Sequence, residues 1–318
     1  MKKALAVLAL SLAMLMTACS SGVKIVPIES LSPRQTAANV FSQEPSATPS
    51  ATEETPIVVA RIDESGMTVS SRINPPMGYT RVRAAENAFA SFLRAYPLRA
   101  AGAQVALYNE QERQDAKAAA VLDVMLGKKN HEGPAGAMAR LIAEYLYAQQ
   151  NYADISFTIG RNFDFTFDKW RQGKKLNSDA TGWTSGGTDS NGEDNFKAYL
   201  TNLFVYISMN TLEKDLVRIE DVDSDEIQVG DIFIGNNAQG KKTAVMVADL
   251  CRNDETGEYL MLLVQGGTPA QQLHIVENPT STALSPWYPC SFATELVTPD
   301  VTIAIEDRYR FKKFVDEE

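Results

Sequence analysis

Histidine, cysteine and basic residues are all scarce in this chain. Its 318 residues include 2 histidines and 3 cysteines, too few for a histidine-rich metal site or a disulfide scaffold. Lysine and arginine number 30 against 40 aspartates and glutamates, which gives a formal net charge of -10. Because binding to nucleic acid needs a basic face, we exclude nucleic acid as a partner. We expect neither a metal nor another cofactor.

A long apolar run is also missing. Residues 4–16 form a mostly apolar run that is shorter than the roughly 20 residues of a membrane-spanning helix, and it follows Lys2 and Lys3. This arrangement is typical of a signal peptide, which we predict for residues 1–18. The segment Met16-Thr17-Ala18-Cys19 resembles a bacterial lipobox, although leucine is more usual than methionine at its first position. The resemblance implies a diacylglycerol on the thiol of Cys19; the alternative is an ordinary secretory leader with an incidental cysteine.

Residues 42–56, which follow Cys19 at some distance, have almost no apolar side chains. They consist mainly of serine, threonine, proline and glutamate, and such a segment cannot bury enough surface to offset its chain entropy. We therefore predict that residues 19–56 form a lipidated, disordered tether, and that residues 57–318 form a single globular domain. The protein is then expected at the cell membrane, lipid-anchored and extracytoplasmic.

The expected helices lie in the first part of this domain. Apolar residues recur at helical spacing in residues 84–96, 134–149 and 194–212. Glycine, serine and aspartate are frequent in residues 173–195, which predicts a long surface loop.

The expected strands dominate the second part. Apolar runs separated by polar turns predict strands at residues 230–234, 243–248, 259–264, 273–276 and 301–305, after earlier ones at 57–62, 104–108 and 119–126. Helices early and strands late predict an α+β fold with an antiparallel sheet.

A set of short segments is spread over the chain from about residue 57 to its end. They are Asn74-Pro75-Pro76, Gly78-Tyr79, Val121-Leu122-Asp123, Arg140-Leu141, Ala143-Glu144-Tyr145-Leu146-Tyr147, Gly230-Asp231-Ile232-Phe233-Ile234, Ala244-Val245, Val247, Gln265, Pro269-Ala270-Gln271, His274-Ile275, Asn278-Pro279 and Pro286-Trp287-Tyr288. In their order and spacing, these segments resemble the lipoprotein family with domain of unknown function 4846.

That family's pattern in turn resembles papain-like, NlpC-type cell-wall peptidases. The likeness implies a papain-like core, with N-terminal helices packed on an antiparallel sheet. In such cores a cysteine opens a buried helix, a histidine lies on the strand after a Gly-Asp strand, and a polar residue on the next strand orients the histidine. The helix N-terminus and a neighbouring imidazolium lower the pKa of the thiol, which makes it a nucleophile.

Two of these three catalytic positions are lost in this chain. Pro134 stands where the thiol is expected, and proline suits the first turn of a helix but cannot attack a carbonyl group. Thr243 stands where the histidine is expected, and it cannot act as a general base near neutral pH. Only Gln265 keeps the character of the orienting residue. The site is therefore predicted to be degenerate, with Pro134 facing Thr243 across a shallow cleft.

The other thiols and the two imidazoles have competing interpretations. Cys251 and Cys290 form either a disulfide, worth about 3–4 kcal/mol in an exported protein, or two buried free thiols. His274 lies on a short expected strand and is either a binding residue or a hydrogen-bonded structural histidine. His131 lies in a polar loop, where it is expected to be solvated.

Polar and aromatic side chains are the candidates for ligand binding. Arg140 and Glu144 lie one helical turn apart and form either an ion pair or a polar lining of the cleft. Trp183 lies in the expected glycine-rich loop without an obvious packing partner, whereas Trp287 and Tyr288 line a groove or pack at its rim. The candidates are Arg140, Glu144, Trp183, Gln265, Gln271, His274, Trp287 and Tyr288.

Three functions compete on these observations. The first is an envelope lipoprotein whose peptidase-like domain binds peptidoglycan or a protein partner without catalysis. The second is an active cell-wall hydrolase that uses other residues, such as His274 with Ser185. The third is a structural lipoprotein of a surface assembly, which predicts a large exposed apolar patch.

Overall fold

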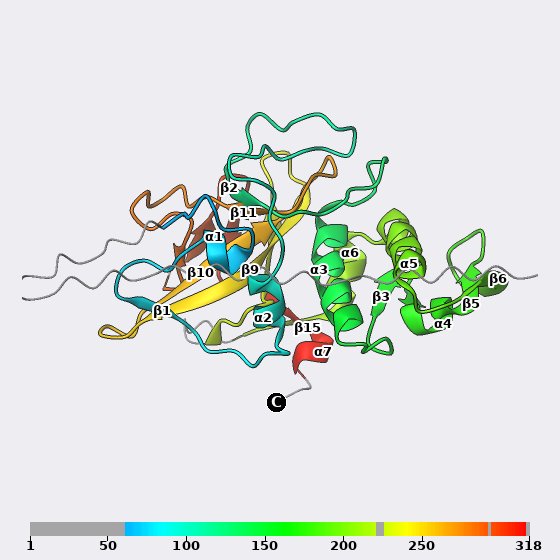
Figure 1. The fold of residues 1–318 in the computed structure, drawn as a ribbon. Helices are drawn as coiled ribbons and strands as arrows, with labels where there is room; N and C mark the ends of the chain where they lie inside the picture. Colours follow the sequence, from blue (N-terminus) through cyan, green and yellow to red (C-terminus); the bar gives the residue numbers. More distant parts are fainter. Residues whose placement is uncertain (1–60, 221–225, 292–293, 316–318) are drawn as a thin grey trace, which may run out of the picture. The chain divides into compact units, whose positions relative to one another are not determined.

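The computed structural model describes residues 61–220, 226–291 and 294–315 (Figure 1). These described residues all belong to one compact unit. The predicted signal peptide, Cys19 and the predicted tether lie outside the described residues, as does most of the strand expected at residues 57–62. No helix within the described ranges is long and apolar enough to cross a bilayer.

Nine strands of the described residues form one antiparallel sheet. Its path runs β2-β11-β10-β9-β8-β15-β7, with β1 paired to the end of β9 and β12 to the start of β10. The strands are β1 Tyr79–Arg81, β2 Ala118–Val121, β7 Leu216–Arg218, β8 Ile232–Asn236, β9 Lys242–Asn253, β10 Tyr259–Gln265, β11 His274–Val276, β12 Tyr288–Pro289 and β15 Arg308–Phe311. The four strands expected between residues 230 and 276 are confirmed as β8 to β11.

The central strand β9 is buried on both faces. Its residues alternate between two apolar clusters: Ala244, Met246 and Ala248 belong to the first, and Val245 and Val247 belong to the second. Because consecutive side chains of a strand point to opposite sides, each cluster covers one face of the sheet, called here the first and the second face. This double burial explains why β9 is almost continuously apolar, whereas a strand buried on one side would alternate.

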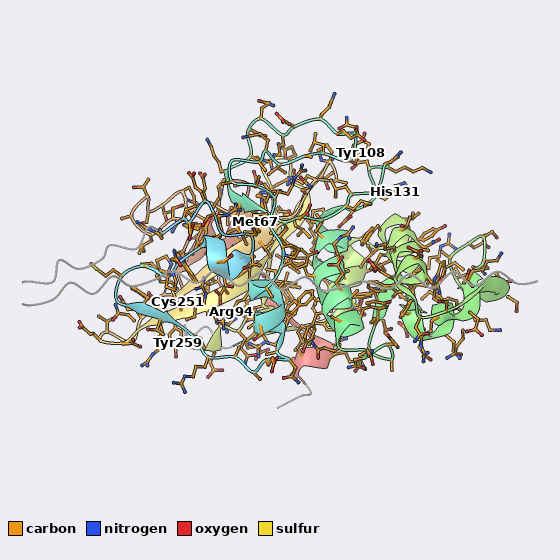
Figure 2. All side chains as sticks on the ribbon, viewed as in Figure 1. Met67, Arg94, Tyr108, His131, Cys251 and Tyr259 are labelled. Carbon is orange, nitrogen blue, oxygen red and sulfur yellow. The ribbon has the colours of Figure 1, made fainter. Side chains whose placement is uncertain are left out.

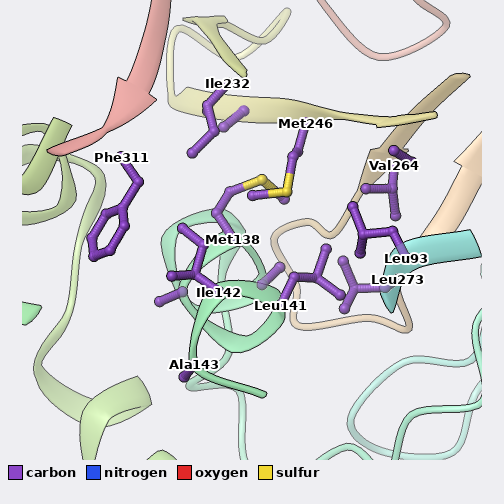
Figure 3. Packing of buried hydrophobic residues seen from close by; sticks show 14 of the residues in the cluster. Leu93, Met138, Leu141, Ile142, Ala143, Ile232, Met246, Val264, Leu273 and Phe311 are labelled. Atoms are coloured by element: carbon purple, nitrogen blue, oxygen red, sulfur yellow. The ribbon is translucent and has the colours of Figure 1, made fainter. Parts of the chain in front are cut away.

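Helices from the first half of the domain cover the first face. Helix α3, Pro134–Ala148, lays Met138, Leu141 and Ile142 against the sheet, and all three side chains are fully buried (Figure 3). Helix α2, Phe89–Arg94, packs beside it on β9. The α+β class and the packing of helices on an antiparallel sheet are therefore confirmed.

A small hairpin packs on the second face. It consists of β13, Glu295–Val297, and β14, Thr302–Ala304. A Cβ atom on Gly235 of β8 would lie 2.8 Å from a side-chain carbon of Ile303, so only glycine allows this close approach. The strand expected at residues 301–305 is thus β14, but the last strand of the main sheet is β15, which sequence patterns do not predict.

A second layer of helices and hairpins lies beyond α3, on the side away from the sheet (Figure 1). Its main helix is α5, Glu193–Tyr206, which contacts α3. The helix expected at residues 194–212 is divided, because Ile207 is extended and Ser208 caps a new helix through the N–H of Thr211. The remaining elements of the domain are α1 Val69–Arg72, β3 Ser156–Ile159, β4 Phe163–Thr166, α4 Phe167–Arg171, α6 Met209–Leu212, the 3-10 helix Glu213–Asp215 and α7 Lys312–Val315.

The prediction of a long surface loop at residues 173–195 is wrong. These residues form an antiparallel hairpin of β5, Gln172–Leu176, and β6, Trp183–Asp189. Most of β6 is exposed, so it shows no alternation of apolar residues that would reveal a strand. The hairpin is held at one end by Trp183, whose ring stacks on Phe165 with centroids 5.4 Å apart.

Two further expectations, a strand at residues 104–108 and a helix at residues 84–96, differ from the structure. Residues 104–108 are not a strand, because within the described residues they form only isolated bridges, such as Ala106 with Glu112. The helix expected at residues 84–96 begins later, at Phe89.

Candidate functional site

Pro134 and Thr243 do not face each other across a cleft. Pro134 is the first residue of α3, which packs on the first face of the sheet. Thr243 pairs with Gly235 and precedes Ala244, whose side chain belongs to the first face, so Thr243 lies on the second face. Strand alternation instead places Lys242 on the side of α3. The predicted juxtaposition of Pro134 and Thr243 is therefore wrong.

Gln265 shares the second face with Thr243. It pairs with Val245, a residue of the second cluster, and its side chain is 3% exposed. The sheet therefore separates Gln265 from Pro134, and the three positions that the peptidase likeness suggests do not converge on one point.

An open groove borders the first turn of α3. We call it the Pro134 groove; its volume is about 430 Å³. The N-cap of α3 is Gly133, which has no side chain to cap the N–H groups of the first turn. The residues that line the groove include His131, Lys241, Lys242 and Thr268. No cysteine is among the described residues of this lining.

A second, more apolar pocket lies between α3, α5 and the segment before α3. We call it the α3–α5 pocket; its volume is about 410 Å³, within the range of small-molecule sites. Its apolar wall includes Leu126, Leu200, Phe204 and Val205. Its rim carries three lysines, Lys128, Lys129 and Lys197, and His131. His131, which is labelled in Figure 2, also lines the Pro134 groove.

A buried ion-pair cluster forms the floor of the α3–α5 pocket. Arg140 donates to both carboxylate oxygens of Glu132, at 2.5 and 2.6 Å, and to Glu144 at 3.0 Å. Its guanidinium also lies 5.0 Å from the ring centre of Phe204. Burial raises the pKa of Glu132, and the hydrogen bonds from Arg140 oppose that effect. The ion pair expected between Arg140 and Glu144 is confirmed, and Arg140 also lines the pocket, as expected for a binding residue.

His274 lies in a buried hydrogen-bonded network on the second face. Its Nδ1–H donates to the carbonyl oxygen of Gln272 at 3.1 Å, and its Nε2 accepts from the side-chain amide of Gln265 at 3.1 Å. Gln265 also donates to Asp300, which Arg113 holds with two hydrogen bonds of 2.9 and 2.6 Å. Burial lowers the pKa of His274 to about 4. The imidazole is therefore uncharged at neutral pH. Of the two roles considered for His274, the structure shows the hydrogen-bonded structural histidine.

Cys251 and Cys290 are free and buried in the structure. Cys251, labelled in Figure 2, pairs with Leu260, and Leu260 pairs on its other side with Pro289. The two cysteines thus lie two strands apart, and each strand spacing is about 4.8 Å. Their Cα atoms are therefore separated by about 9–10 Å, beyond the roughly 7 Å that a disulfide can bridge. Their side chains also belong to different apolar clusters. Because burial raises the pKa of each thiol, neither is poised as a thiolate.

The aromatic candidates pack inside the domain. Trp287 is fully buried and donates from its indole to the carbonyl of Asn74 at 2.9 Å. Tyr288 is 2% exposed and donates to the carbonyl of Glu277 at 2.5 Å. Trp183 packs on the aromatic residues of β4. Trp287 and Tyr288 therefore belong to the core and do not line a groove. Trp183 is half-buried and has the aromatic packing partners that the sequence did not reveal.

The remaining polar candidates, Gln271 and Ser185, line neither the Pro134 groove nor the α3–α5 pocket. Gln271 is 3% exposed and accepts from Arg113 at 3.3 Å. Ser185 is exposed on β6, in a two-stranded sheet separate from the one that carries His274. Within the ranges that the structure describes, no three His, Cys, Asp or Glu side chains gather as metal ligands would.

The α3–α5 pocket escapes sequence analysis almost entirely. Only Arg140 among its lining residues is a sequence candidate. The signal that could have found it is the pair Lys128-Lys129, which follows Leu126 and Gly127 in an acidic chain. The pocket depends on α5, whose approach to α3 no local pattern reveals.

The fold and these pockets define an α+β protein with ligand-sized cavities beside α3, the helix that packs on the main sheet. The chain belongs to the family described as Domain of unknown function (4846), whose model matches residues 69–310. Comparison with curated proteins and with solved structures gives no match.

Proposed function

We propose that this chain is a lipid-anchored envelope protein whose domain binds a component of the cell wall without hydrolysing it. The observation that carries the proposal is the placement of its reactive side chains. Both described thiols are buried, and His274 is enclosed in a hydrogen-bonded network. The pockets beside α3, by contrast, are open to solvent and lined by lysines. A volume of about 410 Å³ suits a small chemical group better than the flat contact surface of a protein partner.

We also propose that the domain keeps a papain-like core whose site has lost its catalytic groups. Helix α3 precedes β8, β9 and β10 in the chain, and it packs on β9 and β10 of their antiparallel sheet. Pro134 opens this helix, where the peptidase likeness would put the nucleophile. The order of these elements along the chain therefore supports the proposed likeness to a papain-like core.

The lipid anchor leads to a direct prediction. Cys19→Ser is expected to abolish incorporation of radiolabelled palmitate and to release the protein from the membrane fraction, because acyl chains supply the binding energy. The measurement is metabolic labelling followed by fractionation. Cys290→Ala is the matched control and should label normally, since Cys290 is buried in the core. Normal labelling of Cys19→Ser would contradict the anchor.

Wall binding without hydrolysis is tested with isolated sacculi. We expect the purified full chain to sediment with sacculi and to release no soluble wall fragments during prolonged incubation. An established wall hydrolase serves as the positive control for release. Fragment release by the wild-type chain that disappears in a folded His274→Ala variant would overturn the proposal and establish an active hydrolase. If the chain failed to sediment, chemical crosslinking in the envelope would identify a protein partner instead.

A further inference from the structure

The α3–α5 pocket combines an apolar interior with a positively charged rim. Phe204 and Leu200 of α5 contribute to the interior, and Val205 at its edge is 43% exposed. Met125, also in the lining, is 84% exposed. Exposed apolar side chains that adjoin a concave apolar surface are typical of a binding site.

The rim is unusual for a chain with a net charge of -10. Lys128 and Lys129 are exposed, and among the described residues neither has an acidic group within ion-pair distance. Lys197 pairs with Glu193 at 2.6 Å, but the two side chains are 58% and 70% exposed, so this pair is weak. The rim thus offers positive charge that the protein itself leaves largely uncompensated.

The charged groups of the floor are already matched to one another. Glu132, the acidic residue that lines the pocket, gives both its carboxylate oxygens to Arg140. Arg140 in turn covers Phe204 and binds Glu144. Because Arg140 covers the ring of Phe204, the apolar surface open to a ligand is that of the wall formed by Leu126, Leu200, Phe204 and Val205 together. The charge that remains for a ligand lies at the rim.

We propose that the α3–α5 pocket binds a small amphipathic carboxylate, with its apolar body against the apolar wall of the pocket and its carboxylate at Lys128 and Lys129. Binding of this kind rests on the proposed role of the domain as a binding module and names the ligand class of that module. Apolar burial supplies most of the affinity, and the lysines supply the selectivity for a negative charge.

Octanoate is the probe for this site. The full lipidated chain in lipid nanodiscs is titrated by ligand-observed NMR, with empty nanodiscs as the blank for partition into lipid. We expect saturable binding with a Kd of about 0.1–5 mM, as the size of the probe allows. Octanamide, which lacks the charge, and butanoate, which lacks the apolar body, should each bind at least about threefold more weakly.

Two pairs of variants separate charge from shape. The double variant Lys128→Gln, Lys129→Gln should weaken octanoate binding by about three- to tenfold and leave octanamide binding unchanged. The matched control is Lys174→Gln, Lys175→Gln on the β5–β6 hairpin, outside the pocket, which should bind like the wild type. Val205→Trp fills the pocket and should abolish binding of both probes, whereas Val217→Trp on β7 should not.

Several results would overturn the pocket assignment. These are no saturable binding of octanoate to the wild type, equal binding by the two double-lysine variants, or full binding by Val205→Trp. A chain that sediments with sacculi but does not bind octanoate would refute the pocket and leave the proposed function standing. A chain that binds octanoate but degrades sacculi would do the reverse.

Discussion

Replacement of Asp249 by alanine is expected to lower the free energy of unfolding by about 3–5 kcal/mol. The carboxylate of Asp249 is fully buried on β9 and accepts from the Nε atoms of Arg81 and Arg94, each at 2.7 Å. It also accepts from the backbone N–H of Leu250 at 2.8 Å. Without this carboxylate, two guanidinium groups whose side chains are only 21% and 15% exposed would be left uncompensated beside each other.

The measurement is urea unfolding of the full chain followed by tryptophan fluorescence, since Trp287 is fully buried. Asp307→Ala is the matched control. Asp307 pairs with Arg218 at 3.2 Å, with side chains 40% and 50% exposed, so its loss should cost no more than about 1 kcal/mol. Similar losses in the two alanine variants would show that Asp249 does not hold β1 and α2 on the sheet.

Acidification from pH 6.5 to 4 is expected to destabilise the domain through His274, by up to about 3 kcal/mol. Burial lowers the pKa of His274 from 6.5 to about 4, and the positive charge of Arg113 acts in the same direction. The hydrogen bond to the carbonyl of Gln272 and the charge of Asp300 oppose this effect but do not cancel it.

The sign of the effect follows from which state binds the proton. Above pH 6.5 the imidazole is neutral in both states and contributes no pH dependence. As the pH falls from 6.5 to 4, the unfolded chain binds a proton that the folded chain excludes, so stability is lost. Below pH 4 the folded chain binds the proton as well, and the loss levels off.

The free energy of unfolding is measured across this range for the wild type and for His274→Gln, which keeps a hydrogen-bonding side chain on β11. The difference between the two curves should change between pH 6.5 and 4 and stay constant outside that window. His131→Gln is the control for the loss of a histidine, because His131 is exposed at the pocket rim, and at pH 7 its free energy of unfolding should be close to that of the wild type. A parallel curve for His274→Gln would contradict a neutral, buried imidazole.

Elements with a strong apolar period follow from the sequence. Helix α3 has a stripe of Met138, Leu141 and Ile142 at helical spacing, and the structure buries all three. Strands β8 to β11 are short apolar runs between polar turns, and the sheet pairs them in chain order. In both cases the pattern is set by burial against the same core, so local sequence carries the information.

Elements held by distant polar contacts do not follow from the sequence. Strand β15 carries Arg308 and Arg310, residues that argue against a buried strand. Arg310 is nevertheless buried, because it binds Asp231 at 2.7 Å, a residue 79 positions earlier in the chain. The hairpin of β5 and β6 is likewise invisible, because its exposed residues need no apolar period.

The sequence by itself determines which chemical groups the domain owns: two thiols, two imidazoles and a proline at the start of α3. Only the tertiary structure decides which of them meet. Thr243 and Gln265 lie on the second face of the sheet while Pro134 lies on the first, because one step along a strand reverses the direction of a side chain. The α3–α5 pocket likewise exists only because α5 packs on α3 and brings Lys197 and Phe204 beside Lys128, and no sequence pattern encodes that contact.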